Sequence, residues 1–188
     1  MLCPHYLRTI PSLSIVALTP TLPAMKMAET VPAGFEISSR PLGPKNTVCR
    51  YRTTRDLTLN PLAIEEAVMT AEPDGRSALR LRFACSELAD WSQTDLRRLA
   101  LYLGEDAVTG SALHLWLTRR QAALYLRLPG QTERVSLDGY FSPGGFSEED
   151  RLWPKGESAF SGYQLLLEYF TFREKFMFVQ LNGLENIT

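Results

Sequence analysis

The sequence has little cysteine, little histidine and no excess of charge of either sign. Its three cysteines, Cys3, Cys49 and Cys85, are too few for a disulfide scaffold and leave at least one thiol unpaired, which favours a reducing compartment such as the cytosol. Twenty Lys and Arg against twenty-one Asp and Glu leave a formal net charge of -1. The broad positive field that sequence-independent nucleic-acid binding requires is absent, so we expect no nucleic-acid partner.

A long uninterrupted hydrophobic run is also missing. The stretch 9–25 carries no charge, but Pro11, Pro20 and Pro23 interrupt it and it is shorter than a membrane-spanning helix. We therefore expect no direct membrane insertion. A secretory signal, with Arg8 before the apolar run 13–18, is the sharper alternative for this stretch, although that run is at or below the short limit.

The remaining composition is that of a folded protein. Hydrophobic residues make up 45% and charged residues 22% of 188 residues, which suits about one compact domain with an attached arm. Seven of the twelve prolines lie in the first 45 residues: Pro4, Pro11, Pro20, Pro23, Pro32, Pro41 and Pro44. Because proline lacks a backbone donor, residues 1–45 are predicted to be a Pro-rich extended arm or edge segment, followed by a β-rich globular domain over 46–188.

Apolar residues at period two predict several strands. Leu79, Leu81, Phe83 and Cys85 alternate with arginines and indicate a half-buried strand. The same alternation occurs in 99–103 and 122–128, with weaker strand candidates at 48–52, 62–70 and 134–137. A sheet of five or more strands is expected, in an α+β, β-rich fold that is mainly an antiparallel sheet or a barrel-like domain with two substantial helices.

The first predicted helix spans 106–120, with an apolar stripe of Val108, Ala112, Leu115 and Trp116 and with Gly110 weakening the prediction. The second begins at Ser161, because Ser161 and Gln164 match a capping box, and Phe160 with Leu165 match a hydrophobic staple. Its apolar stripe is Tyr163, Leu166, Leu167 and Phe170, and Leu165, Tyr169 and Phe172 widen the apolar surface well beyond one face. We therefore expect this helix to be covered nearly all round. Residues 176–181 then indicate a strand buried on both faces.

The residues that carry chemistry do not converge. Cys3 and His5 are the only close pair of zinc-ligand types, and no Gly-x-Ser-x-Gly elbow surrounds any serine. His114 stands among apolar neighbours and is interpreted as a half-buried structural histidine. The glycine-rich stretch 142–146 lacks a phosphate-loop spacing and is predicted to be a turn. It leads to Glu148, Glu149 and Asp150, acids that suit the start of a short helix toward Leu152 and Trp153 better than a catalytic pair or a calcium loop.

One stretch resembles a known family. Residues 160–181, FSGYQLLLEYFTFREKFMFVQL, resemble the "GYxLLxEYFxFxEKFxFFxL" signature of TssF, a baseplate subunit of the bacterial type VI secretion system. Segments 4–7, 10–12, 49–53, 59–62 and 76–82 agree with the family in the same order, so the resemblance covers nearly the whole chain. Val179 and Gln180 depart from it, since the family tends to carry Phe and Asp there. The family is longer, so the chain is expected to be an excised middle region.

The resemblance implies a structural assembly subunit of the baseplate wedge, related to the wedge proteins of contractile phage tails, with no catalytic, cofactor-binding or metal site. The implied partners are TssG and further TssF copies, with TssK through the wedge, in the cytoplasm beneath the inner-membrane complex. The signature residues are interpreted as mainly structural: Gly162, Tyr163, Leu166, Glu168, Tyr169, Phe170, Phe172, Glu174, Lys175, Phe176, Phe178 and Leu181. As core residues, Phe170 and Phe178 are each expected to cost roughly 3 to 5 kcal/mol when changed to Ala.

Two alternatives remain open at this point. One is a small-molecule or glycan-binding β module, with Trp91, Trp116 and Trp153 and the loops of 137–154 around a pocket. The other is a small hydrolase that uses His114 with a serine.

Overall fold

The chain divides into two compact units that alternate along the sequence. The structure, a computed structural model, describes residues 9–104, 106–119, 123–153 and 161–185. One unit is the continuous stretch 17–95, and the other combines the residues up to Val16 with those from Leu96 onward. The predicted division at residue 45 stays a prediction, although strands on either side of it pair with each other.

The unit 17–95 is built from antiparallel ribbons. A short 3-10 helix, η2 (Leu22–Ala24), precedes β1 (Glu29–Val31) and β2 (Glu36–Ser38), which pair with β4 (Leu57–Leu59) and β3 (Arg50–Arg52) respectively. Pro23 lies in η2, whereas Pro32, Pro41 and Pro44 lie between the short strands. Extended segments and turns are what the sequence predicted here.

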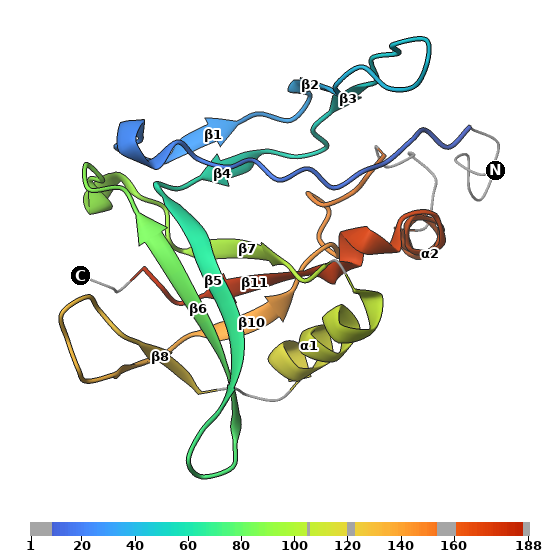
Figure 1. The fold of residues 1–188 in the computed structure, drawn as a ribbon. Helices are drawn as coiled ribbons and strands as arrows, with labels where there is room; N and C mark the ends of the chain where they lie inside the picture. Colours follow the sequence, from blue (N-terminus) through green and yellow to red (C-terminus); the bar gives the residue numbers. More distant parts are fainter. Residues whose placement is uncertain (1–8, 105, 120–122, 154–160, 186–188) are drawn as a thin grey trace. The chain divides into compact units, whose positions relative to one another are not determined.

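A long hairpin follows, made of β5 (Leu62–Ala71) and β6 (Ser77–Cys85) (Figure 1). The turn between them is Glu72-Pro73-Asp74-Gly75, in which Gly75 takes a φ of 82° and its N–H bonds the Glu72 carbonyl at 2.9 Å. Proline then glycine at these positions suits such a turn, because only the second needs positive φ. Beyond the hairpin lies η3 (Trp91–Gln93), which Asp90 caps.

The other unit contains a three-stranded antiparallel sheet in the order β10–β11–β7 (Figure 1). Its strands are β7 (Arg98–Tyr102), β10 (Tyr140–Pro143) and the central β11 (Phe178–Asn182). Leu99 and Leu181, which are register partners, form a core cluster with Leu184. A small hairpin of β8 (Leu124–Leu126) and β9 (Val135–Leu137) adds Leu124 and Leu137 to that core.

Helix α1 (Ala107–Arg119) packs against β10 and β11. Asp106 caps it, accepting from the Thr109 N–H at 2.8 Å, and this bonding lowers the pKa of the Asp106 carboxyl. Gly110, which weakened the sequence prediction, is buried where a Cβ would collide with the Leu103 carbonyl. The glycine is therefore explained by a close approach, not by helix propensity. Within the described residues, neither helix has the length and apolar character needed to cross a membrane.

The α+β, β-rich fold with antiparallel sheets and two substantial helices is confirmed. The expected sheet of five or more strands is wrong for the described residues, because their strands form separate sheets of two or three, not one large sheet or a barrel. The alternating pattern finds strands one at a time and says nothing of which strands join. The last strand also begins later than predicted, since Phe176 and Met177 belong to the 3-10 helix η4 (Arg173–Met177).

Candidate functional site

Helix α2 (Ser161–Thr171) turns its polar side inward. Gln164 is 1% exposed and Glu168 is fully buried, whereas the apolar residues around them are not enclosed to the same degree. Burying a carboxylate is costly unless it is paired and hydrogen-bonded. The contacts around Glu168 therefore decide how the helix sits.

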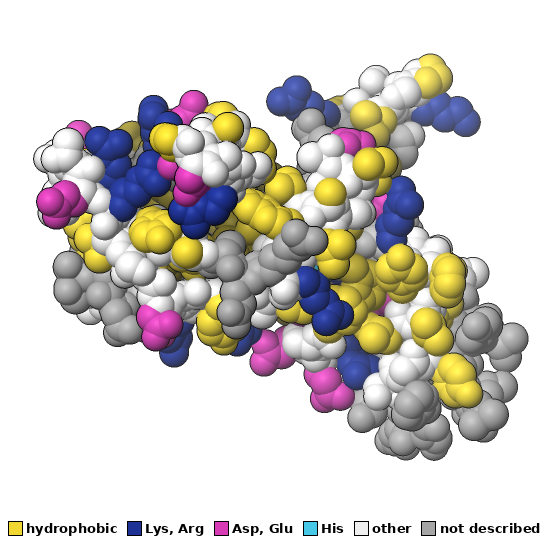
Figure 2. Space-filling view, turned by 90° about the horizontal axis from the view of Figure 1, so that it is seen from below, with side chains coloured by type: hydrophobic (Ala, Val, Ile, Leu, Met, Phe, Trp, Pro, Cys, Tyr) yellow, Lys and Arg dark blue, Asp and Glu magenta, His cyan; other side chains and the backbone are white. Residues whose placement is uncertain are grey.

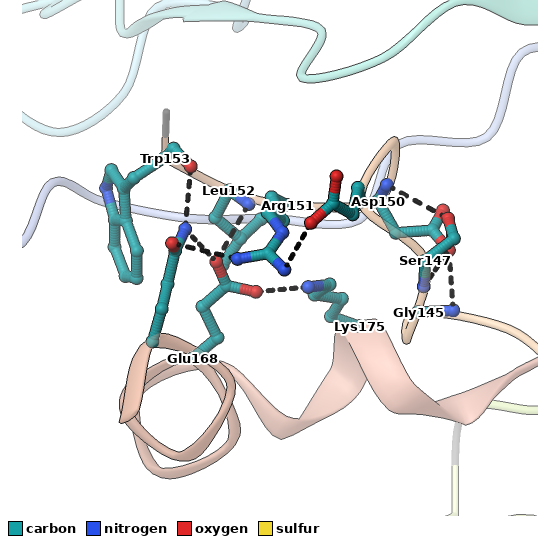
Figure 3. Close-up of polar contacts among 10 residues, drawn as sticks. Gly145, Ser147, Asp150, Arg151, Leu152, Trp153, Glu168 and Lys175 are labelled. Carbon is teal, nitrogen blue, oxygen red and sulfur yellow. Dashed lines mark hydrogen bonds and ion pairs between the residues drawn. The ribbon is translucent and has the colours of Figure 1, made fainter. Parts of the chain in front are cut away.

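Glu168 is held from three directions. It forms a buried ion pair with Lys175 of η4, and its Oε1 accepts from the Leu152 N–H at 3.2 Å and from Gln164 Nε2 at 3.0 Å (Figure 3). Gln164 Nε2 also donates to the Trp153 carbonyl at 2.7 Å. These bonds attach α2 to the chain segment that precedes it.

Arg151 joins the same network from that segment. Its Nη1 donates to Gln164 Oε1 at 3.1 Å and its Nη2 to Glu148 Oε1 at 3.2 Å. Because Gln164 is occupied in this way, the capping box that the sequence predicted with Ser161 does not form, although α2 does begin at Ser161. The Phe160 half of the predicted staple lies outside the described residues.

The acidic stretch before this network forms a turn. The Asp150 carboxylate accepts from the Ser147 hydroxyl at 2.8 Å and from the Gly145 N–H at 3.0 Å (Figure 3). The predicted short helix toward Leu152 and Trp153 is wrong, because Asp150 and Arg151 make only single turn bonds to Ser147 and Glu148. Asp150 shapes the loop, and Glu148 pairs with Arg151.

The opposite side of α2 is apolar and exposed. We call Tyr163, Leu166, Tyr169 and Phe170 the α2 outer face; their exposures are 48%, 56%, 51% and 82%. The expectation that this helix is covered nearly all round is therefore wrong, and so is the core position expected for Phe170. Periodicity identifies an apolar face but cannot say which way it points, and the buried charge network has taken the inner position.

Aromatic rings continue the α2 outer face toward the loop. The Tyr169 ring lies 5.6 Å from Phe170 and 5.5 Å from Phe176, and Phe146 lies 5.0 Å from Phe176. Phe176 is buried, whereas Phe146 is exposed. Figure 2 shows hydrophobic side chains open to solvent over the part of the molecule that holds the helices. The result is an aromatic surface anchored on one buried ring.

The other signature residues lie inside this framework. Phe178 packs its ring on Tyr102 with centroids 5.0 Å apart, Leu181 is in the core, and Phe172 and Glu174 are half-buried. The interpretation of the signature as mainly structural stays a prediction. Burial supports it for Glu168, Lys175, Phe176 and Leu181.

Helix α1 exposes most of the apolar stripe that the sequence predicted for it. Val108, Ala112 and Leu115 are exposed and Trp116 is half-buried, whereas Gly110 and Leu117 face the sheet. The stripe groups residues on one face, as predicted, but that face is largely exposed.

Comparison with known proteins identifies the family. Residues 1–188, the whole chain, match the family model described as "Type VI secretion system, TssF". The chain belongs to the TssF family. A curated relative, the type VI secretion system component TssF1 of Pseudomonas aeruginosa, is 31% identical over 198 residues, which cover 96% of this chain and 32% of the relative.

Two solved structures are similar to this TssF-family chain. A structure of the type VI secretion system TssK-TssF-TssG baseplate subcomplex contains a chain that is 75% identical, with a TM-score of 0.94 over all of this chain and 35% of that chain. A second, the baseplate complex from the type VI secretion system, contains a chain that is 76% identical, with a TM-score of 0.61 over 98% of this chain and 32% of that one. The chain thus spans about a third of the length of these relatives.

The structure of this TssF-family chain does not support the alternative of a ligand pocket lined by tryptophans. A cavity of about 280 Å³ lies beside α2 and is lined by Phe146, Ser147, Arg151, Ser161, Gln164 and Leu165, among others. Trp91, Trp116 and Trp153 are not in its lining, and Trp91 belongs to the other compact unit. Among its polar lining residues, Gln164 bonds both Arg151 and Glu168, so the cavity adjoins the α2 network.

The structure does not support the alternative of a hydrolase that uses His114 either. His114 Nε2 is buried and, within the described residues, no serine hydroxyl bonds it. The imidazole bonds the Phe178 backbone, and burial lowers its pKa. Cys3 and His5 lie outside the described residues, which contain no cluster of three or more His, Cys, Asp and Glu suited to a metal ion.

Sequence reasoning missed the α2 outer face as a surface and Gln164, Glu168 and Lys175 as its support. One feature of the sequence did point to the residues that support this face. Gln164 and Glu168 are spaced i, i+4, so they share one side of the helix, opposite to Leu166 and Phe170. A shared polar side is ordinarily solvated, and here its burial is made favourable by Lys175, Arg151 and the backbone of Leu152 and Trp153.

Proposed function

We propose that this chain is part of a structural assembly subunit of the type VI secretion baseplate wedge, acting through protein contacts and catalysing no reaction. Its partners are TssG and further TssF copies, with TssK reached through the wedge. The subunit works in the cytoplasm, at the baseplate beneath the inner-membrane complex. Family membership and the complexes named for its structural relatives support this assignment.

The observation that carries the proposal is the α2 outer face. Two tyrosines, a leucine and a phenylalanine stand exposed on a helix whose polar side is buried, which is the reverse of a solvated helix. Exposed apolar clusters of this kind mark protein contacts, and aromatic residues dominate the energetics of such contacts. The helix is also rigidly attached, because Glu168 and Gln164 bond the preceding segment. A contact made there needs little further ordering.

The test is co-purification of the full-length protein with TssG and TssK, followed by mass determination of the complex in solution. The double variant L166A/F170A is expected to lose at least about 90% of the recovered complex, since removing two central apolar contacts commonly costs more than 2 kcal/mol of binding. L88A is the matched control, because Leu88 and Leu166 are each 56% exposed.

Normal recovery of the complex with L166A/F170A would contradict the role of the α2 outer face. A wild-type protein that binds neither TssG nor TssK nor itself would contradict the baseplate assignment.

A further inference from the structure

The hairpin β5–β6 is long for a two-stranded sheet. Its strands have ten and nine residues, and among the described residues no third strand joins them. A two-stranded hairpin is marginally stable in water, because it cannot bury enough of either face. Most of β5 is exposed, including Ile64 and Met69. This hairpin is therefore the element of unit 17–95 that most needs a further partner.

The hydrogen bond at the turn shows which backbone groups of β5 point away from β6. The Glu72 N–H donates to the Arg76 carbonyl at 2.7 Å, so Glu72 faces its partner strand. Backbone groups alternate sides along an antiparallel strand, and therefore Thr70, Val68 and Glu66 also face β6. The N–H and C=O groups of Ala67, Met69 and Ala71 point outward. Within the described part of the chain, no hydrogen bond reaches them.

This outer edge lacks the usual protection against strand pairing. Residues 67–71, Ala-Val-Met-Thr-Ala, contain no proline, no glycine and no charge. The register shift between Ile64 and Glu66 bends the strand before this segment, and the turn at Glu72 ends it. The open edge is thus five residues long, which is the length of an ordinary strand.

The two faces of the hairpin differ in polarity. Ile64, Ala67 and Met69 share one face with their register partners Phe83, Leu81 and Leu79. On the other face, Glu66 pairs with Arg82 at 3.5 Å and Val68 lies opposite Arg80. A strand added beside β5 would extend the apolar face with alternate apolar side chains.

The charges at the two ends of the open β5 edge distinguish the strands that could pair with it. In the register that overlaps all five residues with a second copy of β5, Glu66 of one copy would stand opposite Glu72 of the other, at both ends of the pair. Like charges directly opposite one another on a sheet are destabilising. A different chain with Lys or Arg at these two ends meets no such conflict.

We propose that residues 67–71 of β5 pair edge to edge with an extended strand of another baseplate subunit. The occupant is an uncharged segment of about five residues, without proline, apolar at alternate positions and flanked by basic residues. The proposal rests on the proposed function, since it takes the partner to be TssG or TssK. It concerns a different unit of the chain from the α2 outer face.

Hydrogen exchange tests the pairing directly. The full-length protein is compared alone and in complex with TssG and TssK, and deuterium uptake is followed in peptides that cover 66–71. Added backbone bonds are expected to slow exchange at Ala67, Met69 and Ala71 by at least about tenfold. Peptides that cover 77–85 of β6, whose inward bonds are already made, serve as the internal reference. A complex that forms without added protection in 66–71 overturns this proposal and leaves the proposed function standing.

A backbone variant separates the edge from the side chains. Ala67→Pro removes one outward N–H and none of the bonds to β6, and Ala67→Val retains that N–H. We expect Ala67→Pro to weaken binding at least about tenfold and Ala67→Val to bind as the natural protein does. Equal binding by both, or equal loss in both, overturns the edge pairing. The exchange measurement on the natural protein decides the question if Ala67→Pro does not fold. Failure of the natural protein to bind TssG or TssK contradicts the proposed function and this proposal together.

Discussion

At the scale of single residues, Glu168 joins helix α2 to both η4 and the segment before the helix. It is fully buried, it pairs with Lys175, and it receives bonds from Gln164 and from the Leu152 backbone. The sequence signature contains both charges, but a Glu and a Lys seven residues apart do not reveal an ion pair. Their meeting requires α2 to end and η4 to turn the chain back.

Removing one member of this pair is expected to destabilise the protein strongly. In Glu168→Gln the Lys175 ammonium stays buried without its counter-charge, which costs roughly 3 to 5 kcal/mol of unfolding free energy. The double variant E168L/K175M removes both charges and is expected to recover most of that loss. Denaturant unfolding of the full-length protein measures both values. A Glu168→Gln protein as stable as the natural one would show that the pair is not buried.

His114 predicts a pH dependence of stability. Burial lowers the pKa of its imidazole below the usual 6.5, and the bond to the Phe178 backbone opposes that shift only in part. The folded protein thus binds the proton more weakly than the unfolded chain. The stability that His114 contributes is fully present above about pH 6.5. It is lost as the pH falls through the pKa that His114 has in the folded protein. The melting temperature is expected to fall more between about pH 7 and pH 5 in the natural protein than in His114→Gln. Parallel curves for the two proteins would contradict this.

At the scale of elements, α2 shows how an amphipathic pattern can be correct while its orientation is not. The sequence predicted the helix and its first residue, and it correctly grouped Leu166 and Phe170 on one face. The helix was then expected to be covered nearly all round, because its apolar residues extend well beyond one face. Here Gln164 and Glu168 bond the segment before the helix, so the aromatic face is left outside.

Two phenylalanines of the same signature should therefore respond differently to truncation. Phe176 is 6% exposed, and Phe176→Ala is expected to cost roughly 3 to 5 kcal/mol. Phe170 is 82% exposed, so Phe170→Ala should change stability by less than about 0.5 kcal/mol and act on partner binding instead. Thermal melting of the two variants makes the comparison. A large loss of stability in Phe170→Ala would contradict the exposed position of the Phe170 ring.

At the scale of the whole molecule, the core is small and much apolar surface is exposed. The buried hydrophobic residues of the described part are Met25, Leu99, Leu117, Phe176, Val179, Leu181 and Leu184. Exposed large hydrophobics occur on both helices, on β5 and in the loops. Soluble monomers rarely leave this much apolar surface open, so further protein is expected to cover it.

The 188-residue chain expressed alone is accordingly expected to self-associate. If the full-length protein binds TssG and TssK as proposed, we expect the complex to cover these surfaces, so that dye binding to exposed apolar surface falls and the melting temperature rises. Light scattering and thermal shift compare the two samples. A monodisperse, thermally stable monomer from the chain alone would show that the exposed residues need no partner.

The sequence by itself determined the family, the β-rich class and most of the individual elements. These depend on local information: the signature at 160–181 and the alternation in β6, β7 and β8. Only the tertiary structure decided which strands join, which side of each helix is buried and which rings are exposed. Those outcomes depend on contacts between different elements, such as Lys175 of η4 with Glu168 of α2, and β7 with β11. A periodic pattern groups residues on a face, but the free energy of the whole set of contacts chooses the direction in which that face points.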